Sequence, residues 1–303
     1  MHRAPRLLLA FLLGTGVATV QPASRLMASS AEDSGTPAAN AQKAKLKPVS
    51  AASPDIPFNT YEVQTEQQLL ELANHSRQLA GAPPLTLDSG LSQAARIHAQ
   101  AMLDAGQLSH QFNGEPSLIQ RLAATSDLQL DEAGENVALD YDAEHGHEHL
   151  MLSPPHRTNL LNPAYNVVGL GVVRSGDRLY IVQDFGHALP TYSTTEWKNR
   201  VAAAVNQTRR QARQPELTRG DLHAADAAAC SMAHADKLET PSVSRLAQSA
   251  TMLAYTSLQP DTLPAGATHA ITNNNLRTFS IGACYSRTAV YPTGVYWIVL
   301  SLD

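Results

Sequence analysis

Two stretches far apart in this 303-residue chain read alike and in the same order. Asn206-Gln-Thr-Arg-Arg-Gln-Ala212 parallels Asn74-His-Ser-Arg-Gln-Leu-Ala80, and Pro215-Glu-Leu-Thr218 parallels Pro83-Pro-Leu-Thr86. Such self-similarity predicts an internal duplication rather than one continuous core. The alternative is chance similarity between two alanine-rich helices.

The strands repeat as well, and this match does not depend on the helices. Ile281-Gly-Ala-Cys284 parallels Val168-Gly-Leu-Gly171, and Tyr296 to Leu302 parallels Leu179 to Phe185. The middle segments differ, because His110 to Val168 is a long insert that the second copy crosses in fewer residues. We therefore expect the chemistry of this insert to be absent from the second copy, which would be a structural or binding partner.

Apolar periodicity places the elements of the first copy. Thr65-x-x-Gln68 has the pattern of a capping box, and the helix after it should end at Gly81. A second helix is expected from Asp88-Ser89 to Gly106, and a hairpin turn at Ser175-Gly176-Asp177. One face of the second helix is expected to carry Leu91, Ala94, Ala95, His98, Met102 and Leu103.

The first residues have the features of an export signal. Arg3 and Arg6 precede an apolar stretch from Leu7 to Ala18, which is short for a membrane span. We assign residues 1–23 to a signal peptide and the Ala, Ser and Pro-rich residues 24–58 to a flexible linker. An uncleaved membrane anchor is the alternative. The expected location is secreted or periplasmic, with no transmembrane segment after signal removal.

Composition narrows the function classes. The formal net charge is −5, so nothing favours nucleic acid as a partner. The 43% hydrophobic content is enough for a packed core and excludes a wholly disordered chain. Two cysteines cannot build a disulfide-rich scaffold or a zinc ribbon.

The insert carries an ordered set of short motifs. Ser109-His110 is followed by Gly134-Glu-Asn136, then Ser153-Pro-Pro-His156, then Val168-Gly-Leu-Gly171 and Val182-Gln-Asp-Phe185. Together with the helix before them, these motifs resemble the CAP superfamily (cysteine-rich secretory proteins, antigen 5 and pathogenesis-related 1 proteins), in its bacterial secreted branch. The resemblance implies an α+β fold, an α-β-α sandwich over residues 59–190. A smaller α+β module over 191–303 then resembles a truncated, degenerate copy.

The resemblance also implies a cleft lined by two histidines and two acidic residues. His110 and His156 match the histidine positions, and Glu135 matches the acid of the Gly-Glu-Asn motif. The second acidic position falls at Ser153, so the site is expected to hold three of these residues. Glu144 or Glu148 could substitute, although the spacing does not place them.

This trio allows several kinds of chemistry. His110 and His156 could bind zinc, with Glu135 as a ligand or as an outer partner that orients a histidine. A histidine beside a carboxylate could also act as a general base. The trio could equally be a polar network that ties helices to the sheet. Nothing in the spacing supplies an activated nucleophile.

A second histidine motif lies between these residues. His145-x-x-Glu148-His149 matches the H-x-x-E-H pattern of inverted zinc peptidases. We expect Gly146 to weaken a helix here, and that peptidase family requires a much larger catalytic unit. The segment is therefore interpreted as a solvated helix on the rim of the cleft, able to bind metal only adventitiously.

The two cysteines fall in the second copy. Cys230 lies on its second helix and Cys284 on its first strand, so the pair could meet if the copies share a fold. Export favours a disulfide, because disulfides persist outside the cytosol. Two small buried thiols are the alternative.

Three functions follow as hypotheses. The first is a non-enzymatic extracellular or periplasmic binding module whose partner is a small hydrophobic ligand or an extracellular protein. The second is a metal-assisted hydrolase that uses His110, Glu135 and His156 as catalytic candidates with zinc. The third is a structural protein of the cell envelope. The absence of a nucleophile and of a complete acid pair favours the first.

Overall fold

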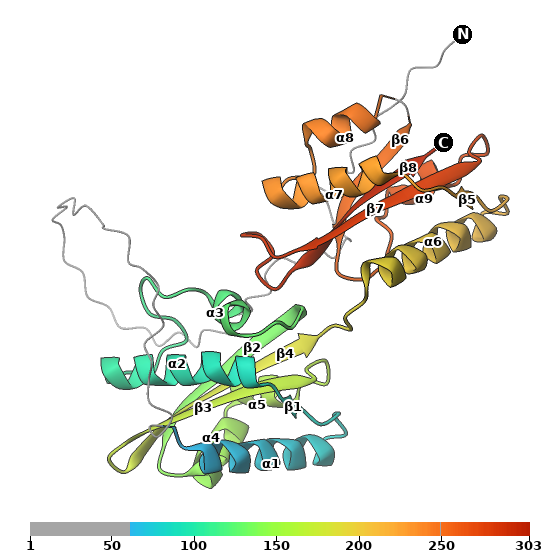
Figure 1. The fold of residues 1–303 in the computed structure, drawn as a ribbon. Helices are drawn as coiled ribbons and strands as arrows, with labels where there is room; N and C mark the ends of the chain where they lie inside the picture. The colour runs from blue at the N-terminus through green and yellow to red at the C-terminus, as the bar shows by residue number, and fades with distance from the viewer. Residues whose placement is uncertain (1–60, 249) are drawn as a thin grey trace, which may run out of the picture.

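The computed structural model describes residues 61–248 and 250–303, which form two modules around two four-stranded sheets (Figure 1). The expected signal peptide (1–23) and linker (24–58) lie outside the described residues. Within the part of the chain that is described, no helix has the length and apolarity needed to cross a membrane.

The first module is a three-layer α-β-α sandwich, which confirms the fold class that the family resemblance implied. Its sheet has the order β1-β3-β4-β2, with β1 parallel to β3 and the other pairs antiparallel. Helices α2 and α3 cover one face, and α1, α4 and α5 cover the other (Figure 1). In chain order the elements are α1 (Val63–Leu79), β1 (Thr86–Leu87), α2 (Ser89–Ala105), α3 (Leu118–Thr125), β2 (Leu130–Asp140), α4 (Ala143–Leu152), α5 (Pro154–Leu161), β3 (Val167–Ser175) and β4 (Arg178–Ala188).

Two glycines let α2 lie directly on the sheet. A Cβ at Gly169 would lie 2.1 Å from the backbone carbonyl carbon of Leu91, and one at Gly171 would lie 2.2 Å from that of Ala95. No side chain larger than hydrogen fits at this distance. The face of α2 that the periodicity predicted is buried there, with only Leu103 remaining partly exposed.

The second module repeats the strand order as β5-β7-β8-β6. Helix α7 packs on one face of this sheet, and α6 and α9 pack on the other (Figure 1). The insert that carries α4 and α5 in the first module is replaced by the short α9. In chain order the elements are α6 (Thr194–Gln211), β5 (Thr218–Arg219), α7 (His223–Ala235), α8 (Pro241–Leu246), β6 (Thr251–Ser257), α9 (Ala267–Ile271), β7 (Thr278–Ser286) and β8 (Val295–Leu302).

The two modules also share side-chain bonds to the backbone. The amide of Asn74 binds both the N–H and the carbonyl of Leu85, and the amide of Asn206 binds Leu217 in the same way. A buried arginine follows each asparagine by three residues. Arg77 donates to the carbonyls of Pro83, Leu160, Asn162 and Tyr165, whereas Arg209 donates to those of Pro215, Ile271 and Asn273. Modules that arose by duplication would be expected to share such contacts. The duplication itself stays a prediction.

The expected capping box at Thr65 is wrong. Helix α1 begins at Val63, with Glu62 as its N-cap, and the Thr65 hydroxyl donates to the Glu62 carboxylate instead. The chain reaches α1 from a bridge between Tyr61 and Val173, and the N–H of Glu62 binds the carbonyl of Val172. This attachment to β3 fixes where the helix begins.

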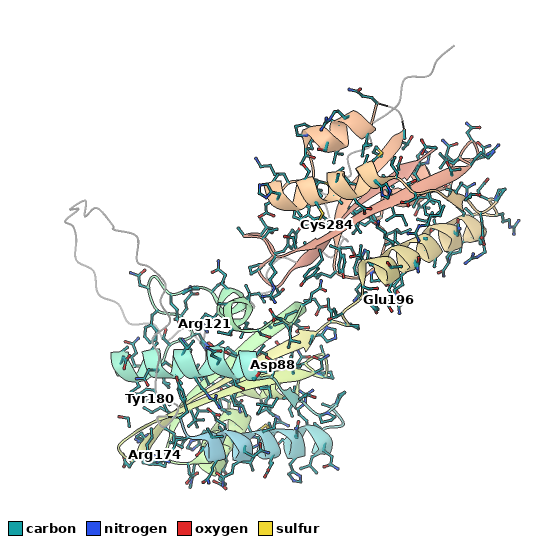
Figure 2. The ribbon with its side chains drawn as sticks, viewed as in Figure 1. Asp88, Arg121, Arg174, Tyr180, Glu196 and Cys284 are labelled. Carbon is teal, nitrogen blue, oxygen red and sulfur yellow. A yellow bond between two sulfur atoms is a disulfide. The ribbon has the colours of Figure 1, made fainter. Side chains whose placement is uncertain are left out.

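The two cysteines form a disulfide, as the export argument predicted. Cys230 on α7 is bonded to Cys284 on β7. The bond joins the helical layer of the second module to its sheet (Figure 2).

Candidate functional site

Glu135 is the centre of a buried polar cluster in the first module. It lies on β2, and its Oε1 accepts a hydrogen bond from Nδ1 of His110 at 2.9 Å. Its Oε2 accepts from Nη2 of Arg121, a residue of α3. Both carboxylate oxygens therefore bind cationic or N–H donors from segments that pack over the strand.

His156 lies close to His110 but comes from another helix. It is on α5, and the two imidazole centroids are 6.4 Å apart. The Asn136 side chain fixes this position because its amide donates to the carbonyl of His156. Burial, and then the neighbouring His110, lower the pKa of His156, so its ring is neutral at pH 7. The structure thus places the three predicted site residues together.

A third histidine, His98, is fully buried on α2. Its Nδ1 lies 2.7 Å from Oε1 of Glu115, and its Nε2 lies 2.8 Å from the carbonyl of Ser109. Each ring nitrogen of His98 therefore faces a hydrogen-bond acceptor. His98 thereby ties the segment that carries His110 to α2. The sequence interpretation placed His98 on an apolar helix face and missed these partners.

A second acid of the cluster is Asp184, away from the position where the resemblance implied an acid and where this chain has Ser153. Asp184 lies on β4 directly opposite Glu135 in the antiparallel pairing. It is fully buried, and neither oxygen has a hydrogen-bond partner within the described residues. Burial, followed by the charge of Glu135, raises the pKa of Asp184 well above its usual range.

The residues considered for the second acid lie elsewhere. Ser153 is the residue between α4 and α5, while Glu144 and Glu148 are exposed on α4. The signal for Asp184 was present in the Val182-Gln-Asp-Phe185 motif, but only the strand register shows that it faces Glu135. Arg121 forms ion pairs with both Glu115 and Glu135. We call His98, His110, Glu115, Arg121, Glu135, His156 and Asp184 the Glu135 cluster.

The predicted zinc trio does not fit this geometry as a three-ligand site. Both oxygens of Glu135 already accept hydrogen bonds, which makes it an outer partner of His110. Two imidazoles on one tetrahedral zinc lie with ring centres roughly 5 Å apart, given Zn–N distances of about 2.0–2.1 Å. The rings of His110 and His156 are 6.4 Å apart. No group of three or more His, Cys, Asp or Glu side chains in residues 61–248 and 250–303 is arranged to hold a metal.

The histidines of α4 have three separate partners. His145 binds Asp142, the N-cap of the helix, whereas His149 binds Asp140 at the end of β2. His147 points the other way, is buried, and lies 2.8 Å from the Ser76 hydroxyl of α1. His145 and His149 are exposed, as the interpretation of a solvated helix requires.

Gly146, which was expected to weaken a helix here, lies inside α4. A Cβ at this position would lie 2.6 Å from Cδ1 of Ile181, so the glycine lets the helix pack on the sheet.

Comparisons with known proteins match the first module. Residues 70–185 match the model of the cysteine-rich secretory protein family, named CAP. The uncharacterized protein YkwD of Bacillus subtilis (strain 168) is 31% identical over 159 residues, which are 52% of this chain and 60% of that protein. The uncharacterized membrane protein YlbC of the same organism is 32% identical over 132 residues, 43% of this chain and 37% of that protein. The chain thus spans less than two thirds of the curated relatives it matches.

Among solved structures, an extracellular protein containing a SCP domain from Bacillus anthracis is 29% identical. The match covers 42% of this chain and 41% of that one, with a TM-score of 0.37.

Proposed function

Residues 70–185 are a domain of the cysteine-rich secretory protein (CAP) family, and from this premise we propose that the chain is an exported, non-enzymatic binding protein. Its ligand is a small amphiphile, and the polar group of that ligand binds His110 and His156. The hydrophobic part of the ligand lies along the segments that carry these two histidines.

The hydrogen bonding of His110 carries this proposal. Its Nδ1 donates to Glu135, its Nε2 has no hydrogen-bond partner among the described residues, and its side chain is 31% exposed. The half-buried, neutral His156 offers one ring N–H and one acceptor. In the part of the chain that the structure describes, no hydroxyl or thiol side chain is hydrogen-bonded to either imidazole. The pair is therefore suited to hold a polar group rather than to activate a nucleophile.

Two exposed leucines support an amphiphilic ligand. Leu108 comes two residues before His110, and Leu152 comes four residues before His156. Leu152 is 72% exposed and Leu108 is 42% exposed. An alkyl chain that covers these leucines would bury apolar surface while its polar head binds the imidazoles.

Calorimetric titration with monomeric palmitate tests the proposal. The wild-type chain is expected to bind one palmitate, and His110→Ala/His156→Ala is expected to weaken binding at least tenfold. This estimate follows because each hydrogen bond to a charged group contributes about 1.5–3 kcal/mol. The matched control is His145→Ala/His149→Ala, which removes two exposed histidines from α4 and should bind as the wild type does.

Other outcomes would redirect the function. Equal binding by all three proteins would place palmitate outside the Glu135 cluster. No binding by the wild type, together with zinc-dependent ester hydrolysis lost in the His110/His156 variant, would instead favour the hydrolase. If the wild type neither binds palmitate nor hydrolyses esters, the structural role would be favoured.

A further inference from the structure

The second module contacts the first at one short segment. Arg287 of the β7–β8 loop donates from Nη1 to the carbonyl of Ala123 at 2.9 Å and from Nη2 to that of Ser126 at 2.8 Å. Thr293 of the same loop donates to the carbonyl of Leu130 at 2.9 Å. The acceptors of these bonds lie at the end of α3 and the start of β2. Figure 1 shows the β7–β8 loop extending toward α3.

Arg287 acts as the C-terminal cap of α3. Ala123 belongs to the last turn of α3, and Ser126 is the residue that caps it. Carbonyls at the end of a helix have no partner within the helix and carry partial negative charge, so a cation is favoured there. A guanidinium can bind two of them at once, because its N–H groups form a planar fork.

The helix that Arg287 caps is the one that carries Arg121. Nη1 of Arg121 donates to the carbonyl of His110 at 3.1 Å and lies 3.2 Å from Oε1 of Glu115, while Nη2 binds Glu135. Arg121 therefore contacts three members of the Glu135 cluster from a helix of only eight residues. A change in the position of α3 would move this cation relative to both acids.

The β7–β8 loop is itself fixed to the second module. Asp236, the C-cap of α7, accepts hydrogen bonds from the Thr288 hydroxyl at 2.8 Å and from the N–H of Val290 at 3.1 Å. The Cys230–Cys284 disulfide joins α7 to β7 shortly before Arg287 (Figure 2). The hydrogen bonds to Asp236 and the nearby disulfide therefore hold the loop segment that carries Arg287 in place.

We infer that Arg287 is a positioning residue for the Glu135 cluster: the second module holds α3, and through α3 it holds Arg121 against Glu135 and His110. This inference deepens the proposed function by assigning the second module a role at the same site. Among the described residues the second module has no counterpart of the cluster, and its contact with α3 is the bidentate one made by Arg287.

The test compares Arg287→Ala, Arg287→Lys and Thr293→Val in the full chain. Thr293→Val is the matched control, because it removes a hydrogen bond between the modules that does not reach α3. Long-range ¹H–¹⁵N NMR spectra of the imidazoles report which ring nitrogen carries the proton and how it is hydrogen-bonded. Arg287→Ala is expected to shift the His110 and His98 signals, Arg287→Lys to restore them in part, and Thr293→Val to leave them unchanged. Palmitate binding should weaken about fivefold in Arg287→Ala.

Several results would overturn the inference. If Arg287→Ala leaves the imidazole spectra as in the wild type, Arg287 only joins the two modules. If Thr293→Val shifts the same signals equally, the shifts result from a weaker contact between the modules in general and not from the loss of the α3 cap. Should Arg287→Ala fail to fold, Asp236→Asn tests the same path by releasing the loop, and unchanged spectra in that variant reject the inference. The spectra do not depend on palmitate, so failure of the proposed ligand is distinguishable from failure of this inference.

Discussion

Asp184 and Glu135 face each other across β2 and β4, and two adjacent buried carboxyl groups cannot both ionise without a large electrostatic cost. The folded chain therefore holds the proton of Asp184 to a higher pH than the unfolded chain, in which the ordinary pKa is 3.8. Unfolding releases this proton at pH values between the two pKa values, so the group costs stability as pH rises above 3.8.

We predict that Asp184→Asn stabilises the protein at pH 8 and not at pH 3.5. The amide has nearly the same shape and cannot ionise, so the linkage to pH disappears. Each unit by which the pKa of Asp184 is raised corresponds to about 1.4 kcal/mol. Denaturant unfolding at both pH values measures the difference, with Asp177→Asn in the exposed turn as control. A variant that is less stable than the wild type at pH 8 would contradict the predicted protonation.

The buried histidines give the opposite dependence on pH. Burial is the main reason that the pKa values of His147 and His156 are lowered, so the folded state disfavours their protonation. Their contribution is present above the ordinary pKa of 6.5 and is lost as pH falls below it. The melting temperature is expected to fall between pH 7 and pH 5.5, and His156→Asn should reduce this slope.

His145 supplies the control because its pKa is shifted in the opposite direction, so its contribution to stability depends on pH in the opposite sense. The hydrogen bond to Asp142 raises its pKa, so its contribution is present at low pH and is lost as pH rises through the folded pKa. His145→Ala should leave the fall in melting temperature between pH 7 and pH 5.5 in place. If this variant removed the fall instead, the buried histidines would not be its cause.

The sequence could name His110, Glu135 and His156 because each lies in a short motif of the CAP pattern. It could not place Asp184, since only the register of β2 with β4 brings that residue opposite Glu135. Arg121 and the partners of His98 were missed for a related reason. Their partners come from segments that meet only after α3 folds over β2.

At the scale of elements, local pattern predicted the helices and hairpins better than it predicted β2. That strand contains Asp131, Glu132, Gly134 and Asn136, which are poor strand formers, and its pairing with β4 overrides their preferences. Gly146 shows the same override in a helix. Its cost in helix propensity is offset by close packing against Ile181.

The contact between α2 and β3 leads to a prediction for the element itself. Gly169→Ala should destabilise the first module by about 3 kcal/mol or more, because the new methyl group meets backbone atoms that cannot move aside. Gly186→Ala is the control, since its Cβ would meet only the side chains of Leu130 and Val167, at 3.1 to 3.3 Å. Equal stability of the two variants, measured by urea unfolding, would show that α2 can shift away from the sheet.

At the scale of the molecule, each module has its own core. The clusters built on the first sheet contain residues up to Ala188 and those built on the second begin at Tyr192, and none draws on both sheets. The repeat in the sequence indicated this division, although the boundaries at 59–190 and 191–303 stay predictions. The hydrogen bonds between the described parts of the two modules are few and lie at one loop. The modules should therefore unfold separately.

We predict two calorimetric transitions for the full chain, of which only one responds to reduction. The disulfide closes 54 residues within the second module, and the chain-entropy model gives it about 4 kcal/mol of stabilisation. Cys230→Ser/Cys284→Ser should lower the transition of the second module and leave that of the first within a few degrees. Trp197 and Trp297 are buried in the second module, so their fluorescence assigns its transition. Equal lowering of both transitions would mean that the two modules unfold as one cooperative unit, and that the loop around Arg287 transmits far more stability than its few hydrogen bonds indicate.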